Sequence, residues 1–413
     1  MIEWSEMHLA IQGAMRRFVD AEIKPNLEAL EHGDTPPYAV LRKLVATFGL
    51  KDMAEARFAS DIAKEKARLE RGEPPREARG PKPGPEAANE LAMRMIPIIE
   101  LSRYCPGMVT ALGVSMGLTA NAIMGKGTIA QKERWGLDLL TLEKIGAWAI
   151  TEPGSGSDAF GAMRSTARCD GDGYVLNGSK TFITNGPYAD TIVFICKLDD
   201  GVTEAKQRKV LSFVLDRGMT GLTQSKPLRK MGLHSSPTGE LFLEDVRVGR
   251  ERLIGETEDA PSRAGAKDTF TAERTGVAAM ALGIVGRCLE LSIDYAKTRV
   301  QFGRPIGEFQ LIQLKLAKME VARINIQNLV FRQIELAEHG KAMGLAEASA
   351  CKLYSAQAAM DVCLEAVQLF GGNGYMAEYQ VEQLCRDAKV LQIYGGTDEI
   401  QISQIARTLM AGG

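Results

Sequence analysis

Apolar residues recur every three or four positions in the first part of the chain, which is the spacing of one face of a helix. This spacing predicts helices over residues 6–49, where Pro25 interrupts the pattern, and again over residues 87–141. From about residue 268 to the end the pattern is helical once more. Its long apolar stripes predict a helical bundle that keeps one face for a partner.

Between these helical parts the pattern changes to short runs of β-branched and other apolar residues. The runs are Tyr174–Leu176, Thr191–Leu198, Val210–Leu215 and Glu240–Val248. The turns between them read DGDG, DDG and RGMTG, residue types that tolerate the positive φ of tight turns. The middle of the chain is therefore predicted to be a β domain.

One stretch of the N-terminal part departs from the helical pattern. Residues 56–90 are rich in Arg, Lys, Glu and Pro, and the run RGEPPREARGPKPGPE has too few apolar groups to fold alone. We expect a charged, proline-rich excursion there. A chain of 413 residues is long enough for two or three compact units. The predicted domains are 1–146 (helical), 147–262 (β) and 263–413 (helical).

The composition, with 45% hydrophobic and 25% charged residues, is that of an ordinary globular protein. A net charge of −2 gives no general attraction for nucleic acid or an anionic membrane. The seven cysteines lie far apart, without a CxxC pair or a His cluster, so neither a disulfide framework nor a metal site is indicated. Because the N-terminus lacks an apolar signal core, and no run of about 18 apolar residues is apparent, we expect a cytoplasmic protein without stable membrane insertion.

A loop of small and hydroxyl-bearing residues follows the β-like entry Trp148–Ile150 and reads TEPGSGSD. Such a loop can bring backbone and hydroxyl donors close to a phosphate or to the polar edge of a ring. Taken alone, a plain turn between domains explains these residue types equally well.

Three further segments add to this loop. They read LNGSKTFITNG at 176–186, RVQFGRPIGEFQ at 299–310 and QLFGGNGYMAEYQVEQLCRDAK at 368–389, which leads into IYGGTDE at 393–399. In the same order and with similar spacing, the four segments resemble the acyl-CoA dehydrogenase family over most of the chain from Ala147 onward. The resemblance implies an α+β, mostly α fold: an N-terminal helical domain, a middle β-barrel-like domain and a C-terminal four-helix bundle. It also implies bound FAD, an acyl-CoA substrate and an electron-transferring flavoprotein as partner.

The resemblance implies flavin contacts at particular positions. Trp148, Ile150 and Thr151 would lie along the pyrimidine edge of the flavin, with the Thr151 hydroxyl donating to it. Phe182 would stack on the flavin, where the family more often has Trp. The Thr184 backbone N–H would face the flavin N5. Hydrogen-bond donors at the edge of the ring tune its ability to accept a hydride.

A second group of positions would bind FAD from a neighbouring subunit, at its pyrophosphate and adenine. Its members are Arg299, Gln301, Phe302, Gln368, Gly371 and Gly372. Thr397 and Glu399 match further FAD contacts, and Ser157 would reach the flavin phosphate or the thioester region. Because the cofactor would be contacted by two subunits, we expect an oligomer, and specifically a homotetramer. A plainer interpretation also holds for some of these residues, since Arg299 could close a helix and Gly371 could be a helix C-cap.

Gly395 raises the question of where the catalytic base lies. Many relatives carry a carboxylate at this position, whereas here only the backbone N–H of Gly395 could donate to the thioester carbonyl. Isovaleryl-CoA and long-chain acyl-CoA dehydrogenases are similar in having Gly or Ala there and take their base from a Glu-Arg pair, which Glu273 and Arg274 match. We therefore expect Glu273 to be the base, with Arg274 and Tyr394 at the substrate. The alternative is that Glu273 and Arg274 are solvated charges on an exposed helix turn.

The implied reaction is the dehydrogenation of an acyl-CoA to the trans-2-enoyl-CoA. Two alternatives stay open at this point: an acyl-CoA oxidase-like flavoenzyme that uses dioxygen, and a non-catalytic FAD-binding subunit of a heteromeric complex. The residues do not indicate the length or branching of the acyl chain.

Overall fold

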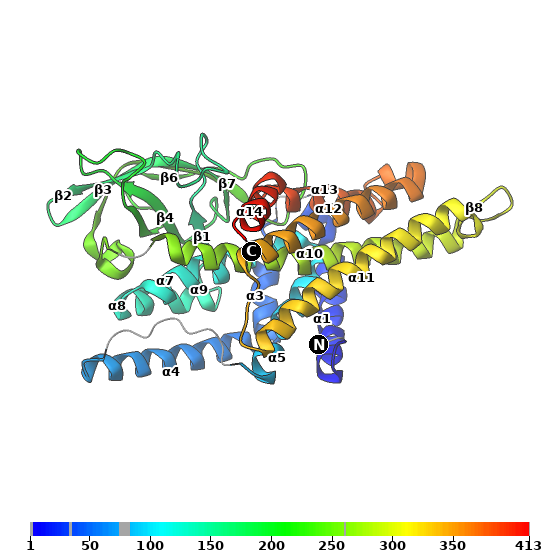
Figure 1. Ribbon diagram of the computed structural model, residues 1–413, viewed down its shortest axis with the longest axis horizontal. Coiled ribbons are helices and arrows are strands. Elements are labelled where there is room, and N and C mark those ends of the chain that lie inside the picture. Colours follow the sequence, from blue (N-terminus) through cyan, green and yellow to red (C-terminus); the bar gives the residue numbers. More distant parts are fainter. Residues whose placement is uncertain (1–2, 33–34, 74–82, 260–261, 413) are drawn as a thin grey trace.

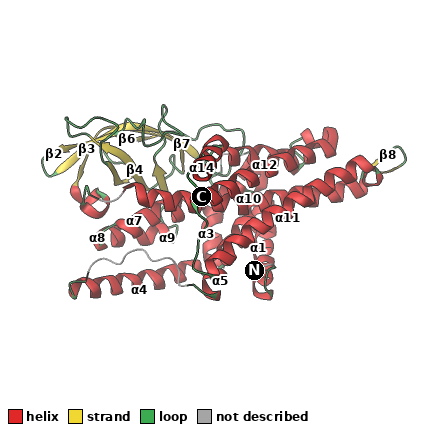
Figure 2. Ribbon diagram, in the orientation of Figure 1, coloured by secondary structure: helices red, strands yellow, loops and turns green. Residues whose placement is uncertain are grey.

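A computed structural model of the chain describes residues 3–32, 35–73, 83–259 and 262–412 (Figure 1). Helices come first, strands follow and long helices end the chain, so the expected mostly helical α+β fold is confirmed. Figure 2 shows the strands β2, β3, β4 and β6 gathered at one end of the molecule, the long helices running toward the other, and β8 at that other end.

The N-terminal part consists of helices of very different lengths, several of them joined by 3₁₀-helical or π-helical turns. These helices are α1 (Glu6–Phe18), α2 (Leu27–Glu31), α3 (Tyr38–Thr47), α4 (Leu50–Glu70), α5 (Pro85–Ser102), α6 (Pro106–Leu112), α7 (Ala120–Lys126), α8 (Ile129–Gln131) and α9 (Leu137–Leu140). A π-helical segment, Gly113–Thr119, joins α6 to α7. Gly146 in the first strand comes so close to this segment that a Cβ on it would lie 2.7 Å from Thr119.

The expectation of an excursion over residues 56–90 is wrong at both ends. Residues 85–90 form the first turns of α5, where Ala87 and Ala88 are buried. Helix α4 continues unbroken to Glu70 and buries Ile62. Charged side chains on this helix find partners on another helical segment, as in the ion pair of Glu65 with Lys132 at 2.7 Å. A pattern that counts only apolar residues cannot see such partners. The proline-rich residues 74–82 lie outside the described residues.

The middle part is a curled sheet. Its strands are β1 (Gly146–Ala149), β2 (Thr166–Asp170), β3 (Gly173–Thr184), β4 (Thr191–Leu198), β5 (Val210–Asp216), β6 (Leu222–Gln224) and β7 (Thr238–Gly249). Among the described residues they form one seven-stranded sheet in the order β1-β4-β2-β3-β7-β6, with β5 paired to β4. Both faces of β4 are buried: Ile192 and Phe194 join the core inside the sheet, and Val193 joins the core under α7 and α9. This explains why β4 is a continuous apolar run.

The C-terminal part is built around helix α10 (Ser262–Thr298). A small ribbon of β8 (Val300–Gln301) and β9 (Arg304–Pro305) connects α10 to α11 (Gln310–Glu338), and α12 (Leu345–Phe370), α13 (Gln380–Lys389) and α14 (Asp398–Met410) complete the chain. Helix α10 lies against α5, and a Cβ on Gly283 would lie only 2.2 Å from the carbonyl oxygen of Ile99. Glycine is therefore required for this close approach of the two helices.

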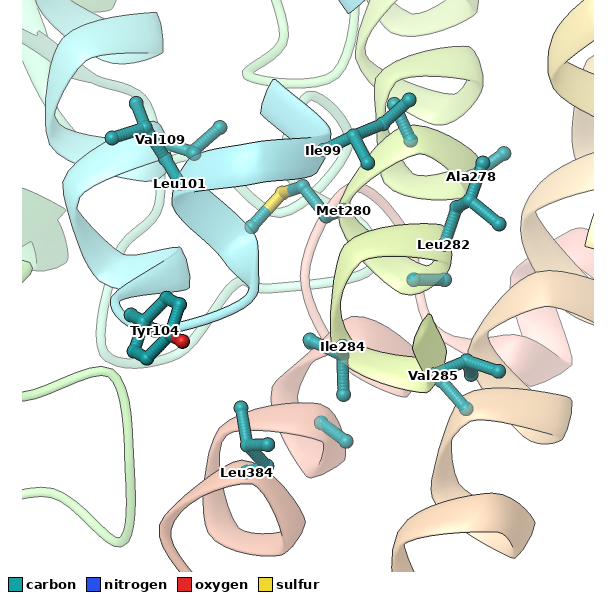
Figure 3. Packing of buried hydrophobic residues seen from close by; sticks show 14 of the residues in the cluster. Ile99, Leu101, Tyr104, Val109, Ala278, Met280, Leu282, Ile284, Val285 and Leu384 are labelled. Carbon is teal, nitrogen blue, oxygen red and sulfur yellow. The ribbon is translucent and has the colours of Figure 1, made fainter. Parts of the chain in front are cut away.

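One apolar core joins the N-terminal helices to the C-terminal helices. Figure 3 shows Ile99 of α5, Val109 of α6, Met280 and Ile284 of α10, and Leu384 of α13 converging on it. Because both helical parts share this core, neither can bury its apolar face without the other.

Two segments, Pro106–Lys126 and Glu273–Thr298, are long and apolar enough to cross a membrane by length and composition. In the second, 67% of the apolar window is buried inside the protein, and in the first 39%. A core helix passes the same test, so this is weak evidence for a membrane span. The apolar character of the second segment is explained by its central place in the bundle.

A buried carboxyl pair lies where the three parts of the chain meet. Glu31 at the end of α2 is 1% exposed, and Asp387 of α13 is fully buried. Asp387 accepts hydrogen bonds from the Leu233 backbone N–H and from Gln383 Nε2. Burial and the neighbouring Asp387 carboxylate raise the pKa of Glu31 to about 8. Folding therefore favours the protonated form of Glu31.

We expect Glu31→Gln to reduce the loss of stability at alkaline pH. Between pH 4.5 and about 8 the folded chain holds a proton on Glu31 that the unfolded chain releases, so the free energy of unfolding falls as pH rises through this window. Glutamine carries no such proton, and urea unfolding at pH 6 and pH 8.5 should show a smaller difference, by up to about 2 kcal/mol. The exposed Glu28→Gln on the same helix is the control and should keep the wild-type slope. Parallel pH profiles for wild type and Glu31→Gln would contradict this assignment.

Candidate functional site

Glu273 and Gly395 lie side by side, although they are far apart in the sequence. Glu273 belongs to α10, and Gly395 belongs to the loop that precedes α14. Gly395 has a φ of +62°, and a Cβ built on it would lie 3.5 Å from the carboxyl carbon of Glu273. The carboxyl group of Glu273 therefore occupies the space that a side chain at position 395 would enter.

The surroundings of Glu273 favour a carboxyl group with a high proton affinity. Burial raises the pKa of Glu273, and the positive charges of Arg274 and Lys352 partly oppose the rise. Arg274 is only 7% exposed, and its Nη1 donates to Ser349 Oγ at 3.0 Å. The alternative of a solvated Glu-Arg pair on an exposed helix turn is therefore wrong for Arg274.

Tyr394 lies next to this pair. Its hydroxyl donates to the sulfur of Met280 at 3.2 Å, and Met280 is on α10 as Glu273 is. Burial raises the pKa of Tyr394, so its phenol stays neutral at any ordinary pH. Tyr394, Glu273 and Gly395 thus face one small region between α10 and the loop before α14.

The loop after β1 is fixed by a buried ion pair that the sequence pattern did not reveal. Lys180 of β3 is fully buried, and its Nζ donates to the Ile150 carbonyl at 3.0 Å and to Glu152 Oε1 at 2.9 Å. Glu152 also accepts from the backbone N–H groups of Arg164 and Ser165, at 2.7 and 2.9 Å. Burial works against ionisation of Glu152, but Lys180 and these donors hold its pKa below the usual value.

Phe182 stands out on β3 beside that loop. It has a φ of +57°, uncommon for a bulky residue, and lies where the pairing of β3 with β7 shifts register. The bulge turns the ring outward, and 69% of Phe182 is exposed. Thr181 donates its N–H to the Thr151 carbonyl at 2.9 Å, which ties the Phe182 region to the loop after β1.

The predicted ring-contact residues gather on this part of the sheet. Trp148 is a partly buried residue of β1, Ile150 and Thr151 follow it directly, and Thr184 ends β3. Ser157 is exposed in the loop after β1. Thr397 is the N-cap of α14, where its hydroxyl accepts from the Ile400 N–H at 3.4 Å, and Glu399 is exposed in the first turn of α14.

The other predicted cofactor residues lie at the opposite end of the molecule (Figure 1). Arg299, Gln301 and Phe302 form the exposed ribbon after α10, and Phe302 is 94% exposed. Gln368, Gly371 and Gly372 are exposed at the end of α12. Tyr295 connects the ribbon after α10 to the end of α12, because its ring stacks on that of Phe370 with 4.1 Å between the ring centroids. Within one chain, the predicted cofactor residues therefore form two groups that lie far apart.

Sequence reasoning missed the buried polar residues behind the loops. Besides Lys180 and Glu152, they are Lys352 of α12 and Gln401 of α14, both fully buried. A signal was present for Lys352, because it lies three residues from buried Ser349 and four from buried Ala356, on the buried face of α12. Within the described residues no group of three His, Cys, Asp or Glu is placed to hold a metal ion.

Comparisons with known proteins point to one family. The model of the acyl-CoA dehydrogenase middle domain matches residues 147–246, and that of the acyl-CoA dehydrogenase C-terminal domain matches residues 264–410. An acyl-CoA dehydrogenase of Bacillus subtilis (strain 168) is 36% identical over 416 residues, which cover 98% of this chain and 100% of the relative.

Solved structures agree with this likeness. Butyryl-CoA dehydrogenase from Megasphaera elsdenii superposes with a TM-score of 0.81 at 31% identity, covering 99% of this chain and 100% of that one. A chain in a structure of the electron-transferring flavoprotein of Acidaminococcus fermentans superposes with a TM-score of 0.79 at 31% identity, covering 99% of each.

We expect Lys180→Met to destabilise the β domain and free the loop after β1. Removing one partner of a buried ion pair leaves Glu152 uncompensated, which costs about 3–5 kcal/mol. The midpoint of urea unfolding should fall, and limited proteolysis should cut faster within residues 153–162. Lys180→Met with Glu152→Gln should recover part of the loss, because the unpaired charge is gone. Equal midpoints for the single and double variants would contradict the role of the pair.

Proposed function

Because the chain belongs to the acyl-CoA dehydrogenase family, we propose that it converts an acyl-CoA thioester to the trans-2-enoyl-CoA with FAD as cofactor. The observation that carries this proposal is the contact of Glu273 with the space above Gly395. A carboxylate and a loop glycine that converge in this way form a place where a thioester carbonyl and its α-carbon can be held together.

Glu273 is the proposed base. Its carboxylate takes the α-proton, the β-hydrogen leaves with its electron pair, and a carbon–carbon double bond forms between the two carbons. Bound FAD supplies the acceptor for that hydride. A base works best when its pKa lies near the working pH, and burial moves the pKa of Glu273 upward in that direction.

The backbone N–H of Gly395 is the proposed donor to the thioester carbonyl. A donor placed at the oxygen where negative charge develops lowers the barrier to α-proton removal. Tyr394 and Arg274 border the same region, and their proposed role is to position the thioester.

The residues of the β domain fit a bound flavin. The exposed ring of Phe182 offers a face on which a planar ring system can stack, and the bulge of β3 holds it outward. Trp148, Ile150, Thr151 and Thr184 supply apolar surface and donors on the same part of the sheet. Ser157, which is exposed in the loop after β1, is the proposed contact to a phosphate or to the thioester.

A second subunit completes the proposed cofactor site. Phe302, at 94% exposure and with a φ of +52°, is held outward at the tip of the ribbon after α10. Arg299, Gln301, Gln368, Gly371 and Gly372 share this end of the molecule and would hold the pyrophosphate and adenine of the FAD of another copy.

The assembly is proposed to be a homotetramer. Exposed apolar side chains line a groove between α11 and α12, and they include Val321, Tyr354 and Leu364. The charged residues Lys318, Asp361 and Glu365 line the same groove, and a surface that mixes apolar and charged side chains suits a further copy of the chain. The proposed electron acceptor is an electron-transferring flavoprotein.

One assay distinguishes the proposed function from the two alternatives, an oxidase and a non-catalytic subunit. The purified protein is examined for a flavin absorption spectrum and then mixed, without oxygen, with a panel of acyl-CoAs. Bleaching followed by rapid reoxidation in air with hydrogen peroxide release identifies an oxidase. A flavin spectrum that no acyl-CoA bleaches indicates a non-catalytic FAD-binding subunit.

We expect Glu273→Gln to abolish most turnover while FAD stays bound. Glutamine keeps the shape of the side chain but removes the basic oxygen, so the rate of flavin bleaching should fall by about 10²–10⁴, or about 3–5 kcal/mol of barrier. In the wild type this rate should rise with pH as Glu273 ionises, and the midpoint should lie above the ordinary pKa of a glutamate. Glu290→Gln on the same helix, outside the site, is the control. Near-normal bleaching in Glu273→Gln would leave the base unidentified.

We expect Arg299→Ala to weaken FAD binding without unfolding the chain. Arg299 is exposed in the single chain, so its loss removes a contact to the cofactor of a neighbouring copy rather than a contact of the core. FAD content after gel filtration should drop, with a dissociation constant at least tenfold higher, while the helical circular dichroism is unchanged. Arg304→Ala on the other strand of the same ribbon is the control. A monomer that keeps one FAD per chain would overturn the two-subunit site.

A further inference from the structure

Lys352 is a charged residue in the interior of the protein. It lies on α12, its side chain is fully buried, and its Nζ donates to the Gly396 carbonyl at 2.8 Å. Its Nζ also lies 3.5 Å from Asp398 Oδ1, at the first residue of α14. A buried charge costs much solvation energy, and an apolar residue of similar volume is usually at least as stabilising. The position of Lys352 therefore calls for an explanation other than stability.

The contacts of Lys352 reach the loop that carries Gly395 and the first residue of α14 directly after it. Gln401, fully buried on α14, donates through Nε2 to the carbonyls of both Gly395 and Gly396, at 3.0 and 2.8 Å. Lys352 and Gln401 together hold the carbonyl side of these two glycines. The glycines have φ angles of +62° and +89°, which glycine adopts without strain, and these contacts select one conformation of an otherwise flexible pair.

The N–H of Gly395 is left available by this arrangement. In the part of the chain that the structure describes, no protein acceptor takes this N–H. Because the carbonyls on the two following peptides are fixed, the direction of the N–H before them is restricted as well. A ligand carbonyl can therefore meet a donor whose place is already set.

Lys352 also acts on the charge of the site. The charged groups around it are Glu273, Arg274 and Asp398. Its positive charge favours the ionised form of Glu273, as that of Arg274 does, while Asp398 compensates Lys352 itself. Tyr394 faces Glu273 as a neutral phenol. With the charge at 352 removed, of these two cations only Arg274 still favours the ionised form of Glu273.

We propose that Lys352 is a positioning residue for the reaction, which holds the Gly395–Gly396 backbone so that the Gly395 N–H meets the thioester carbonyl beside Glu273. This inference rests on the proposed function of the site. It adds that the loop is fixed from α12, through a lysine that touches neither substrate nor cofactor.

The test uses Lys352→Met in the FAD-loaded full chain, with Lys132→Met as matched control. Met has a similar length and suits a buried position. Lys132 is also a mostly buried lysine paired with a carboxylate, but it lies outside the site on the N-terminal part. Two quantities are measured: the limiting rate of flavin bleaching by an acyl-CoA across pH, and the hydrogen exchange of a peptide spanning residues 393–400.

We expect the limiting rate of Lys352→Met to fall about 10–100-fold, because a misplaced donor loses most of its effect on the barrier. The midpoint of the pH profile should rise by half a unit or more, since Glu273 loses a neighbouring positive charge. Exchange of the 393–400 peptide should become at least tenfold faster. Lys132→Met should match the wild type in all three respects.

Each outcome decides the inference. A normal rate and pH midpoint in folded Lys352→Met overturn it, and so does unchanged exchange of the 393–400 peptide. If no acyl-CoA bleaches the wild type, the proposed function fails and the exchange measurement alone decides whether Lys352 holds the loop. Should Lys352→Met not fold, Lys352→Met with Asp398→Asn removes the uncompensated carboxylate and is measured in its place. A lower rate with an unshifted pH midpoint and unchanged exchange reduces Lys352 to a packing residue and overturns the proposal.

Discussion

The tight packing of α10 against its neighbours is the contact on which the rest of the molecule depends. Gly283 lets α10 approach α5 so closely that no side chain fits between them, and the same helix contributes to the core shared by both helical parts. Glu273 lies on this helix, so the carboxyl group inherits a fixed position and a poorly solvated environment. A base on a mobile loop would have neither.

The two loops at the site, the one after β1 and the one before α14, are each held by a buried lysine. Lys180, a buried lysine of the sheet, holds the loop after β1. Lys352, a buried lysine of α12, holds the loop before α14. Each donates to a backbone carbonyl and pairs with a carboxylate, which compensates part of the solvation lost on burial. Irregular backbone at the site is thereby given the rigidity of the regular elements behind it.

The sequence was a good guide wherever periodic burial decides the structure. The spacing of apolar residues predicted the two helical parts, the β domain between them and their order along the chain. The motifs singled out Glu273 and Gly395 together as candidate site residues. It failed for residues 56–70, where a charged helix is held by partners such as Lys132 on another segment. It also missed Lys180, whose polar neighbours Ser179 and Thr181 give no sign of burial, and Lys352, whose place on the buried face of α12 was visible but whose partners were not. The resemblance implied that the predicted cofactor residues fall into two groups, and the length of α10 explains how far apart the two groups lie in one chain.

The left-handed glycine at 395 limits the order in which mutations can move a base between helix and loop. Adding a carboxylate at 395 first would strain the backbone and place its Cβ 3.5 Å from the carboxyl carbon of Glu273. Removing Glu273 first would leave the site without its proposed base. Every single-step path between the two arrangements therefore crosses a poor intermediate, so a lineage that carries its base on the helix is expected to keep it there through long divergence of the acyl pocket.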